Sequence, residues 1–300
     1  MQNILTKLPI KFFFDNIELK EKNALYVVAT PIGNLSDITI RALKILSEVD
    51  FIICEDTRVT AKLLQQYQIF DKKLIVYNDH SDESARIKVL ALIQQQKKIA
   101  LVSDAGTPLI SDPGYKLINF LRLNNCQIVA IPGPSALTAS LSISGIACDQ
   151  FLFLGFLPNS TIQRQKIFKN YSRNFSWIAF ESALRLMETL KLLQESIPNC
   201  KIAIAKELTK IHEQIIFGDV KQVIEYFNDN SDKVKGELVI IIEKINRNEK
   251  QYCDDELEKS IIDAIKSGKT LKDLSQELSE IYSLHKKEIY QIALNIKNNL

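Results

Sequence analysis

The sequence predicts an α/β protein with two α/β domains, a ligand-binding cleft between them, and a small C-terminal helical module. Over residues 24–148, short apolar runs alternate with amphipathic helical patterns, which is typical of a mainly parallel sheet with helices on both faces. A second series of apolar runs begins at Phe151, and the shorter insertions between its last three runs favour antiparallel strand pairs. Residues 257–300 show only helical patterns.

The expected elements follow in chain order. The first series predicts strands at residues 25–30, 51–54, 74–77, 99–103 and 128–131, with helices at 37–48, 58–67, 82–96, 115–124 and 135–143. The second series predicts strands at residues 151–154, 178–180, 201–205, 214–217 and 238–242. We place the boundary near residues 148–150, giving domains over 24–148 and 149–245. A cleft between two such domains is a usual place for a ligand.

The C-terminal region is expected to be a separate module over residues 246–300. A polar stretch after Glu243, KINRNEKQYCDDE, predicts a linker, and helices are expected at residues 257–266, 271–281 and 286–295. Gly268 separates the first two helices, and Thr270 is placed to cap the second. The module has the size of a helix-turn-helix, but many such tri-helical pieces bind nothing, so its shape alone says little about function. Residues 1–23 form an N-terminal extension to which we assign no role.

Composition narrows the class of protein. The net charge of +2 is nearly neutral, so a nucleic-acid partner has to be argued from local patches. No apolar run approaches the roughly 20 residues of a membrane span, and the N-terminus lacks a clear cleavage site for a signal peptide. The five cysteines are scattered and form no CxxC pair, which argues against a disulfide framework or a zinc cluster and favours a cytoplasmic protein without a metal.

The most informative stretch is IALVSDAGTPLISDPG, from Ile99 to Gly114. A buried strand followed by a bent loop with carboxylates is how open α/β sheets present ligand sites. Most of the 9 Gly and 8 Pro lie in five short segments that follow apolar runs. These segments include the ATPIGN loop at residues 29–34 and the IPGPSA loop at residues 131–136. The chain contains neither GxGxxG nor GxxxxGK[ST], so dinucleotide and Walker-type phosphate sites have no support.

Charged residues follow other predicted strands. The CEDTR motif places Glu55, Asp56 and Arg58 after one strand, and His80 follows the next. A capped helix start with Asp56 as the cap and a local ion pair is an equally good interpretation of CEDTR. AKELT and KGEL each place a Lys-Glu pair beside a strand end, where a surface ion pair is the default.

A basic stretch marks the second domain. Residues 150–180 contain no Asp or Glu, whereas Arg164, Lys166, Lys169 and Arg173 occur there among aromatic residues. We expect these four side chains, with Lys286 and Lys287 of the C-terminal module, to contact RNA phosphates. A solvated helix face is the alternative interpretation.

The motifs together resemble one protein family. ATPIGNLSDIT, CEDTR, VSDAGTPLISDPG, IPGPSA, GFLP, AKELTK and KGEL occur in the order and spacing of ribosomal RNA small subunit methyltransferase I, a branch of the tetrapyrrole methylase superfamily. The match covers about residues 24–245, and the C-terminal module looks like the helix-turn-helix cap of that family. The resemblance implies a tetrapyrrole methylase-like fold, a homodimer, and S-adenosylmethionine bound in the cleft between the two α/β domains.

The resemblance also implies the reaction, which is 2′-O-methylation of a cytidine ribose in the decoding region of small-subunit (16S) rRNA, free or in the assembled subunit. The methyl group of the cofactor is already activated, so no metal is required. The cofactor pocket is expected to contain Pro31, Asp104, Ala105, Gly106, Thr107, Pro108, Ser135 and Ala136. Glu55, Asp56, Arg58 and His80 are expected to face the ribose, with Lys206 and Glu207 reaching from the second domain. The general base stays open among Glu55, Asp56 and His80.

Two other functions are compatible with parts of the sequence. Superfamily members that act on tetrapyrroles usually carry GxGPGD in the first loop, where this chain has residues 29–34 as ATPIGN, and this departure favours the rRNA branch. A tetrapyrrole, corrinoid-precursor or other small-molecule methyltransferase would not need residues 257–300 or the acid-free basic stretch. A non-catalytic RNA-binding protein of ribosome assembly would have no reason to keep a cofactor cleft.

Overall fold

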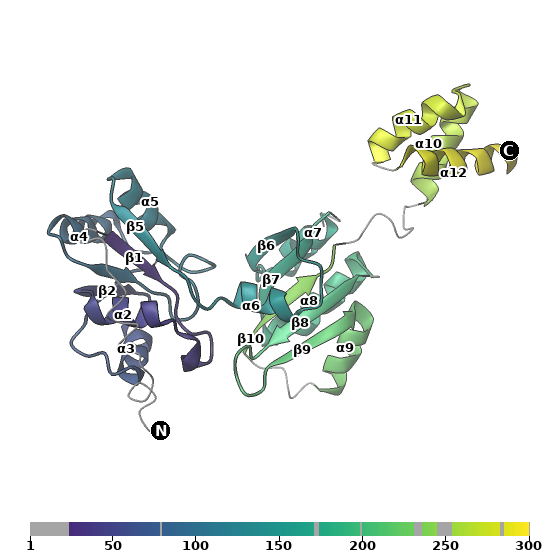
Figure 1. Cartoon of the computed structure of the whole chain (residues 1–300). Coiled ribbons are helices and arrows are strands. Elements are labelled where there is room, and N and C mark those ends of the chain that lie inside the picture. The colour runs from purple at the N-terminus through teal and green to yellow at the C-terminus, as the bar shows by residue number, and fades with distance from the viewer. Residues whose placement is uncertain are drawn as a thin grey trace. The chain divides into compact units, whose positions relative to one another are not determined.

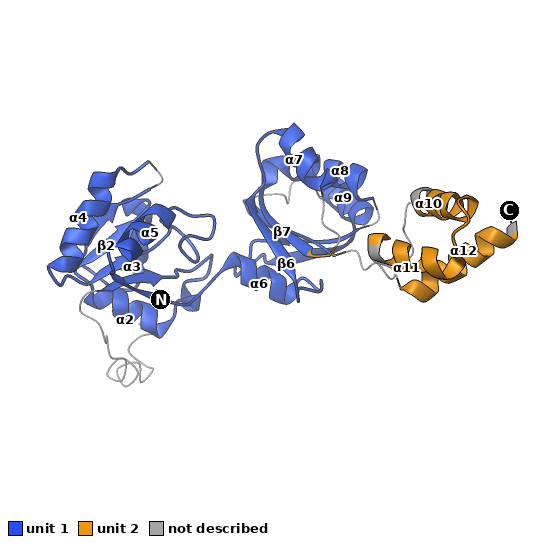
Figure 2. Ribbon diagram, turned by 90° about the horizontal axis from the view of Figure 1, so that it is seen from above, with its two compact units in different colours: residues 1–171, 176–243 blue, residues 172–175, 244–300 orange. Residues whose placement is uncertain are grey.

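The computed structural model describes residues 24–78, 80–170, 174–198, 200–230, 236–244, 254–282 and 285–299 (Figure 1). The chain divides into two compact units, one of residues 1–171 and 176–243 and one of residues 172–175 and 244–300 (Figure 2). The first unit carries both α/β series and the second carries the C-terminal helices. The N-terminal extension and most of the expected linker lie outside the described residues.

The first sheet is entirely parallel, as the alternation predicts. Its strands are β1 (Ala24–Val28), β2 (Phe51–Cys54), β3 (Lys73–Val76), β4 (Ile99–Leu101) and β5 (Gln127–Ile131), in the order β3-β2-β4-β1-β5. The chain leaves β1 toward one edge of the sheet and leaves the adjacent β4 toward the other edge. This reversal creates a crevice at the carboxyl ends of β1 and β4, where doubly wound sheets bind their ligands.

Helices cover both faces of the first sheet. One face packs against α2 (Ile40–Glu48) and α3 (Thr57–Gln66), through a core that includes Tyr26, Ile45 and Leu64. The other packs against α4 (Glu83–Gln94) and α5 (Tyr115–Leu123), through a core that includes Leu25 and Leu117. Successive strand residues such as Leu25 and Tyr26 enter opposite cores because strand side chains alternate. Burial on both faces explains the nearly continuous apolar runs in the sequence.

The second sheet is mixed, and its antiparallel pairs confirm the expectation from the short insertions. It contains β6 (Phe151–Phe156), β7 (Ser176–Ser182), β8 (Lys201–Lys206), β9 (Gln214–Asp219) and β10 (Glu237–Ile242), in the order β6-β7-β10-β8-β9. Among the described strands of this sheet, β6 and β7 pair in parallel, and the other three pairs are antiparallel. Helices α7 (Thr161–Lys169), α8 (Leu186–Ser196) and α9 (Val220–Asp229) lie together on one face, opposite α6 (Ala136–Ile143) (Figure 2).

Helix α6 belongs to the core of the second sheet. Leu141 of α6 and Ile146 pack with Ile178, Ala203 and Val239 of that sheet. The division between the two cores therefore falls before α6, near Pro132-Gly133-Pro134, earlier than the expected boundary at residues 148–150. The sequence pattern shows that α6 is a helix, but only packing shows which sheet its apolar face covers.

The second unit is a bundle of α10 (Asp254–Lys266), α11 (Leu271–Tyr282) and α12 (Lys286–Asn299). Its core contains Leu257, Ile261, Leu274, Leu278, Ile289 and Ala293. Thr270 caps α11, since its Oγ1 accepts a hydrogen bond from the Asp273 amide at 3.2 Å, as predicted. Among the described residues, no helix is both long and apolar enough to cross a membrane.

Candidate functional site

Three loops at the carboxyl ends of β1, β4 and β5 are joined by hydrogen bonds. The Thr30 amide donates to the Gly106 carbonyl oxygen at 2.8 Å, and the Gly106 amide donates to the Thr30 carbonyl oxygen at 3.0 Å. The Thr107 hydroxyl donates to the carbonyl oxygen of Pro134 at 3.0 Å. Fold topology thus brings together loops that are far apart in the sequence. They meet at the crevice between β1 and β4, where the connections of the chain change direction across the sheet.

A pocket of about 380 Å³ opens beside these loops within the first unit. The loops and α6 contribute one wall, formed by Ile32, Ala105, Gly106, Thr107, Ile110, Ser111, Asp112, Ser135 and Ala136. The second α/β series contributes the other wall, formed by Phe156, Phe180, Ala205, Glu207, Leu208, Lys210, Glu237, Leu238 and Val239. A pocket of this size with apolar walls and a few charged groups is typical of small-molecule and cofactor sites.

Left-handed backbone conformations surround the pocket. Leu109 and Ser111 have φ values of 73° and 67° in the loop after β4, and Glu207 and Thr209 have values of 51° and 65° after β8. Residues other than glycine rarely adopt this region, and a β-branched threonine does so least. Such strain is characteristic of functional loops that the surrounding structure holds in place.

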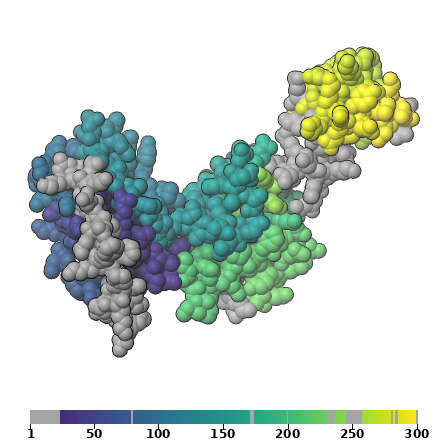
Figure 3. Space-filling model, in the orientation of Figure 1, coloured from purple at the N-terminus to yellow at the C-terminus, as the bar shows by residue number. Residues whose placement is uncertain are grey.

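Gly33 brings the first loop into contact with the loop after β8. A Cβ atom at Gly33 would lie 2.8 Å from Thr209 Oγ1 and 2.9 Å from the Leu208 carbonyl oxygen. In the space-filling view, purple atoms of the first α/β series adjoin green atoms of the second (Figure 3). Only glycine fits there without displacing the loop that carries the pocket residues Leu208 and Lys210.

Asp112 is a pocket residue that the sequence analysis did not select. Burial raises the pKa of its carboxyl group to about 6, a hydrogen bond with Ser103 opposes the shift, and the nearby carboxylates of Glu55, Asp104 and Glu237 add to it. The sequence signal was available, because Asp112 lies within the ISDPG end of the most informative loop. Lys210 and Glu237 were likewise not selected, although both line the pocket.

The cofactor residues expected from the sequence divide into two groups. Ala105, Gly106, Thr107, Ser135 and Ala136 line the pocket. Pro31 and Pro108 are buried beside lining residues, and Asp104 is exposed and accepts a hydrogen bond from the Asp56 amide at 3.3 Å. Ser135 occupies the N-cap position of α6, but its side chain makes no capping hydrogen bond.

The CEDTR motif forms a capped helix start, which confirms the alternative interpretation. Asp56 is the N-cap of α3 and accepts a hydrogen bond from the Arg58 amide at 2.8 Å. Its Oδ2 also lies 2.6 Å from Arg58 Nη2, and this hydrogen-bonded pair lowers the pKa of Asp56 to about 2. The side chains of Glu55, Asp56 and Arg58 are not among the pocket-lining groups of the described chain.

The other expected catalytic residues take different places. His80 is exposed and is not among the lining residues that the structure describes, and its neighbour Asp79 lies outside the described residues. Lys206 is 6% exposed within β8, whereas its neighbours Ala205 and Glu207 line the pocket. The Glu207 carboxylate lies in the pocket wall and pairs with Lys210 Nζ at 3.0 Å.

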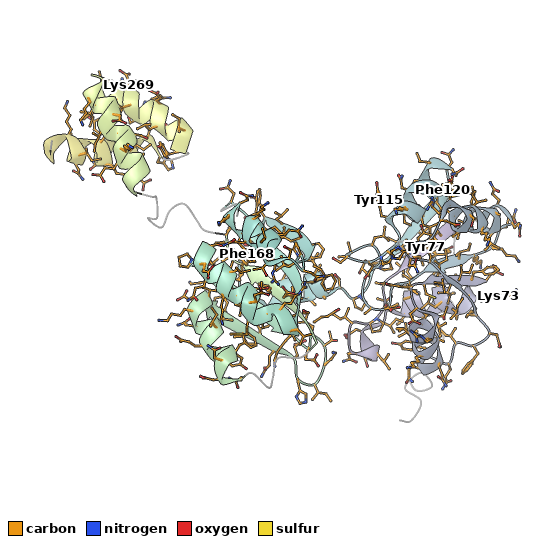
Figure 4. The ribbon with its side chains drawn as sticks, turned by 180° about the vertical axis from the view of Figure 1, so that it is seen from behind. Lys73, Tyr77, Tyr115, Phe120, Phe168 and Lys269 are labelled. Carbon is orange, nitrogen blue, oxygen red and sulfur yellow. The ribbon has the colours of Figure 1, made fainter. Side chains whose placement is uncertain are left out.

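The expectation that Arg164 contacts RNA is wrong. Its side chain is 0% exposed, pairs with Glu188, and places Nη1 3.6 Å from Glu181 Oε2 and 3.2 Å from Thr189 Oγ1. Arg164 and Phe168, which is labelled in Figure 4, are the buried residues of α7. The acid-free sequence around Arg164 gave no sign of its partners, because β7 and α8 supply both carboxylates from later in the chain.

The remaining basic residues have varied positions. Lys166 and Lys169 are exposed on α7, and Arg173 lies outside the described residues. In the second unit, Lys286 and Lys287 are exposed and line a hollow of about 290 Å³ together with Lys272, Ser275, Tyr290 and Gln291. Three of the six residues that line this hollow are lysines. Within the described ranges, no group of three or more His, Cys, Asp or Glu side chains is arranged to hold a metal ion.

Comparison with known proteins adds sequence and fold relatives. A family model described as Tetrapyrrole (Corrin/Porphyrin) Methylases matches residues 24–224. A Rickettsia prowazekii protein named Ribosomal RNA small subunit methyltransferase I is 41% identical over 275 residues, which cover 91% of this chain and 96% of the relative. A Hydrogenobaculum protein of the same name is 46% identical over 225 residues, covering 74% and 96% of the two chains.

A solved structure has a similar fold. The X-ray structure of cobalt precorrin-4 methyltransferase, a cobalamin biosynthetic enzyme, aligns with a TM-score of 0.55 at 14% identity. The alignment covers 74% of this chain and 95% of that chain. At this level of identity the likeness concerns the fold alone.

Proposed function

Because the chain belongs to the ribosomal RNA small subunit methyltransferase I family of tetrapyrrole methylases, we propose that it methylates small-subunit rRNA with S-adenosylmethionine. The observation that carries the proposal is the pocket at the reversal point of the first sheet. The loops after β1, β4 and β5, which contain the family motifs, form one wall of the pocket, and the second α/β series closes it.

The pocket residues fit S-adenosylmethionine. Ile32, Ala136 and Phe180 offer apolar surface to an adenosyl group, and the carboxylates of Glu207 and Glu237 suit a cationic sulfonium. Gly106, with φ of +78°, leaves backbone open to a ligand at a point where a Cβ would lie 3.3 Å from Ile32 Cγ2. When bound, the cofactor supplies a methyl group that is already activated by its positive sulfur.

The chain itself has two tasks in this reaction. It holds the nucleophilic oxygen in line with the methyl group, which lowers the barrier by positioning the reactants. It also accepts the proton of a weakly acidic hydroxyl group. The strained backbone at Ser111 and Glu207 supports the first task, because it fixes both sides of the pocket.

The proposal extends to the ribose 2′-oxygen of a cytidine in the decoding region, on the strength of the motif resemblance. Exposed Lys166, Lys169, Lys286 and Lys287 are the proposed phosphate contacts. Pro31 and Pro108 are proposed to support the cofactor loops beside the lining residues, and Asp104 is proposed to contact the cofactor from the exposed part of the loop after β4. A cytoplasmic homodimer is proposed as the working form, since two-fold symmetry is the commonest for homo-oligomers.

The experiment is to map ribose methylation on small-subunit rRNA from cells with and without the gene. We expect one 2′-O-methylated cytidine to disappear without the protein and to return when purified protein and S-adenosylmethionine are added. Free rRNA and assembled small subunits are compared as substrates in the second step. An unchanged methylation map in the absence of the protein would contradict the proposed function.

A further inference from the structure

Asp112 lies in the pocket wall, on a loop with strained backbone on both sides of it. It is half-buried and lies between Ser111, whose φ is 67°, and Pro113-Gly114, where Gly114 has φ of +129°. A Cβ atom at Gly155 of β6 would lie 3.2 Å from Ser111 Oγ, so the second sheet closely contacts the loop at this point. The loop that carries Asp112 is therefore held by its strained backbone and by this close approach of the second sheet.

The other charged residues of the pocket are less suited to accept a proton. The described lining contains four charged residues, namely Asp112, Glu207, Lys210 and Glu237. Lys210 is a cation, and its Nζ lies 3.0 Å from Glu207 Oε1, so the Glu207 carboxylate is engaged in an ion pair. Glu237 is exposed to solvent. Asp112 combines partial burial with a place in the pocket wall.

The charges around Asp112 favour a moderately basic carboxylate. Burial is the largest influence, and the carboxylates of Glu55, Asp104 and Glu237 act in the same direction, so the pKa rises to about 6. A base with a pKa close to the working pH combines a deprotonated resting state with useful affinity for the proton. By contrast, the pKa of Asp56 is about 2, and His80 lies outside the pocket lining.

We propose that Asp112 is the proton acceptor for the ribose hydroxyl group, an inference that rests on the proposed function. The hydroxyl O–H bond breaks as its proton passes to an Asp112 carboxylate oxygen. The hydroxyl oxygen uses its electron pair to bond the methyl carbon, while the carbon–sulfur bond breaks and its pair stays on sulfur. The products are the methyl ether, a neutral thioether and protonated Asp112, which returns its proton to solvent.

The test measures single-turnover methyl transfer to small-subunit rRNA from pH 5 to 8.5 at saturating cofactor and RNA. In the wild type, the rate constant is expected to rise with pH as Asp112 loses its proton and then to level off, because the carboxylate must be deprotonated. Asp112→Asn is expected to be about 10²- to 10⁴-fold slower at pH 7.5. Its rate is also expected to lose the rising part of the pH profile, which we call the pH limb. Asp112→Glu, which keeps the carboxylate, is expected to recover part of the rate together with a pH-dependent limb.

Two further readouts separate catalysis from folding and cofactor binding. Isothermal titration with S-adenosylmethionine is expected to give D112N an affinity within a few-fold of wild type. Carboxyl-carbon NMR of aspartate-labelled protein is expected to lose one resonance that titrates near pH 6 in D112N. Asp71→Asn is the matched control, because Asp71 is exposed in a turn with φ of 59°, a conformation that asparagine tolerates.

The outcomes distinguish the two proposals. An active wild type with a D112N variant that keeps both its rate and its pH limb overturns the proton-acceptor role alone. A D112N variant that binds the cofactor at least tenfold more weakly, but keeps the limb at saturation, also overturns it and makes Asp112 a cofactor-binding residue. A wild type that transfers no methyl group to small-subunit rRNA overturns the proposed function, and the role of Asp112 is rejected with it.

Discussion

Replacing Arg164 tests whether the basic stretch is structural or RNA-binding at this position. In Arg164→Met, a side chain of similar length loses its charge, and Glu181, which is 0% exposed, loses one of its two cationic neighbours. Removing one member of a buried ion pair costs about 3–5 kcal/mol, because the partner charge stays buried. Arg185 Nη2 remains 2.6 Å from Glu181, so we expect the lower end, a loss of about 3 kcal/mol.

The assay is urea unfolding followed by fluorescence of the single tryptophan. Trp177 is 4% exposed on β7, the strand that carries Glu181, so its fluorescence reports on the sheet in question. Lys169→Met on the exposed face of α7 is the matched control, with an expected change within about 0.5 kcal/mol. The double variant R164M/E181M is expected to recover most of the loss, since it removes the stranded carboxylate.

An Arg164→Met variant whose free energy of unfolding stays within about 1 kcal/mol of wild type would contradict a structural role for this ion pair. If that variant also reduced the slope of log rRNA affinity against log salt concentration by about one, Arg164 would be a phosphate contact after all. If the double variant were no more stable than the single one, the loss would come from packing around the arginine stem rather than from the buried charge.

Substitutions at Gly33, at two exposed lysines and a truncation at the linker test other parts of the molecule. Gly33→Ala places a Cβ 2.9 Å from the Leu208 carbonyl oxygen, so we expect the protein to lose about 1–3 kcal/mol of stability. We also expect weaker S-adenosylmethionine binding by calorimetry. A variant that keeps both its stability and its affinity would rule out the contact. Lys169→Glu with Lys286→Glu should weaken rRNA binding and reduce its salt slope by about two, with cofactor affinity unchanged, whereas an unaltered slope in filter binding would indicate solvated faces. Truncation after Glu243 should keep the dimer and cofactor binding but lower rRNA affinity, and light scattering that shows a monomeric core would contradict a dimer formed through the α/β unit.

The sequence by itself determined the local elements and the nature of the loops. Apolar runs separated by amphipathic segments predicted the strands and helices of both sheets, because side-chain periodicity follows directly from backbone geometry. Capping at Asp56 and Thr270 was equally readable, since a cap depends on a few adjacent residues. The Gly and Pro residues that follow apolar runs marked the loops that form the pocket, including Gly106.

Only the tertiary structure decided which distant residues meet. The buried position of Arg164 depends on carboxylates from β7 and α8, and the packing of α6 depends on a sheet whose strands all follow it in the chain. Asp112 becomes a candidate base because folding removes water from it and places Glu55 and Glu237 nearby. Burial and electrostatic environment depend on all neighbours in space, whereas a sequence pattern records only neighbours along the chain.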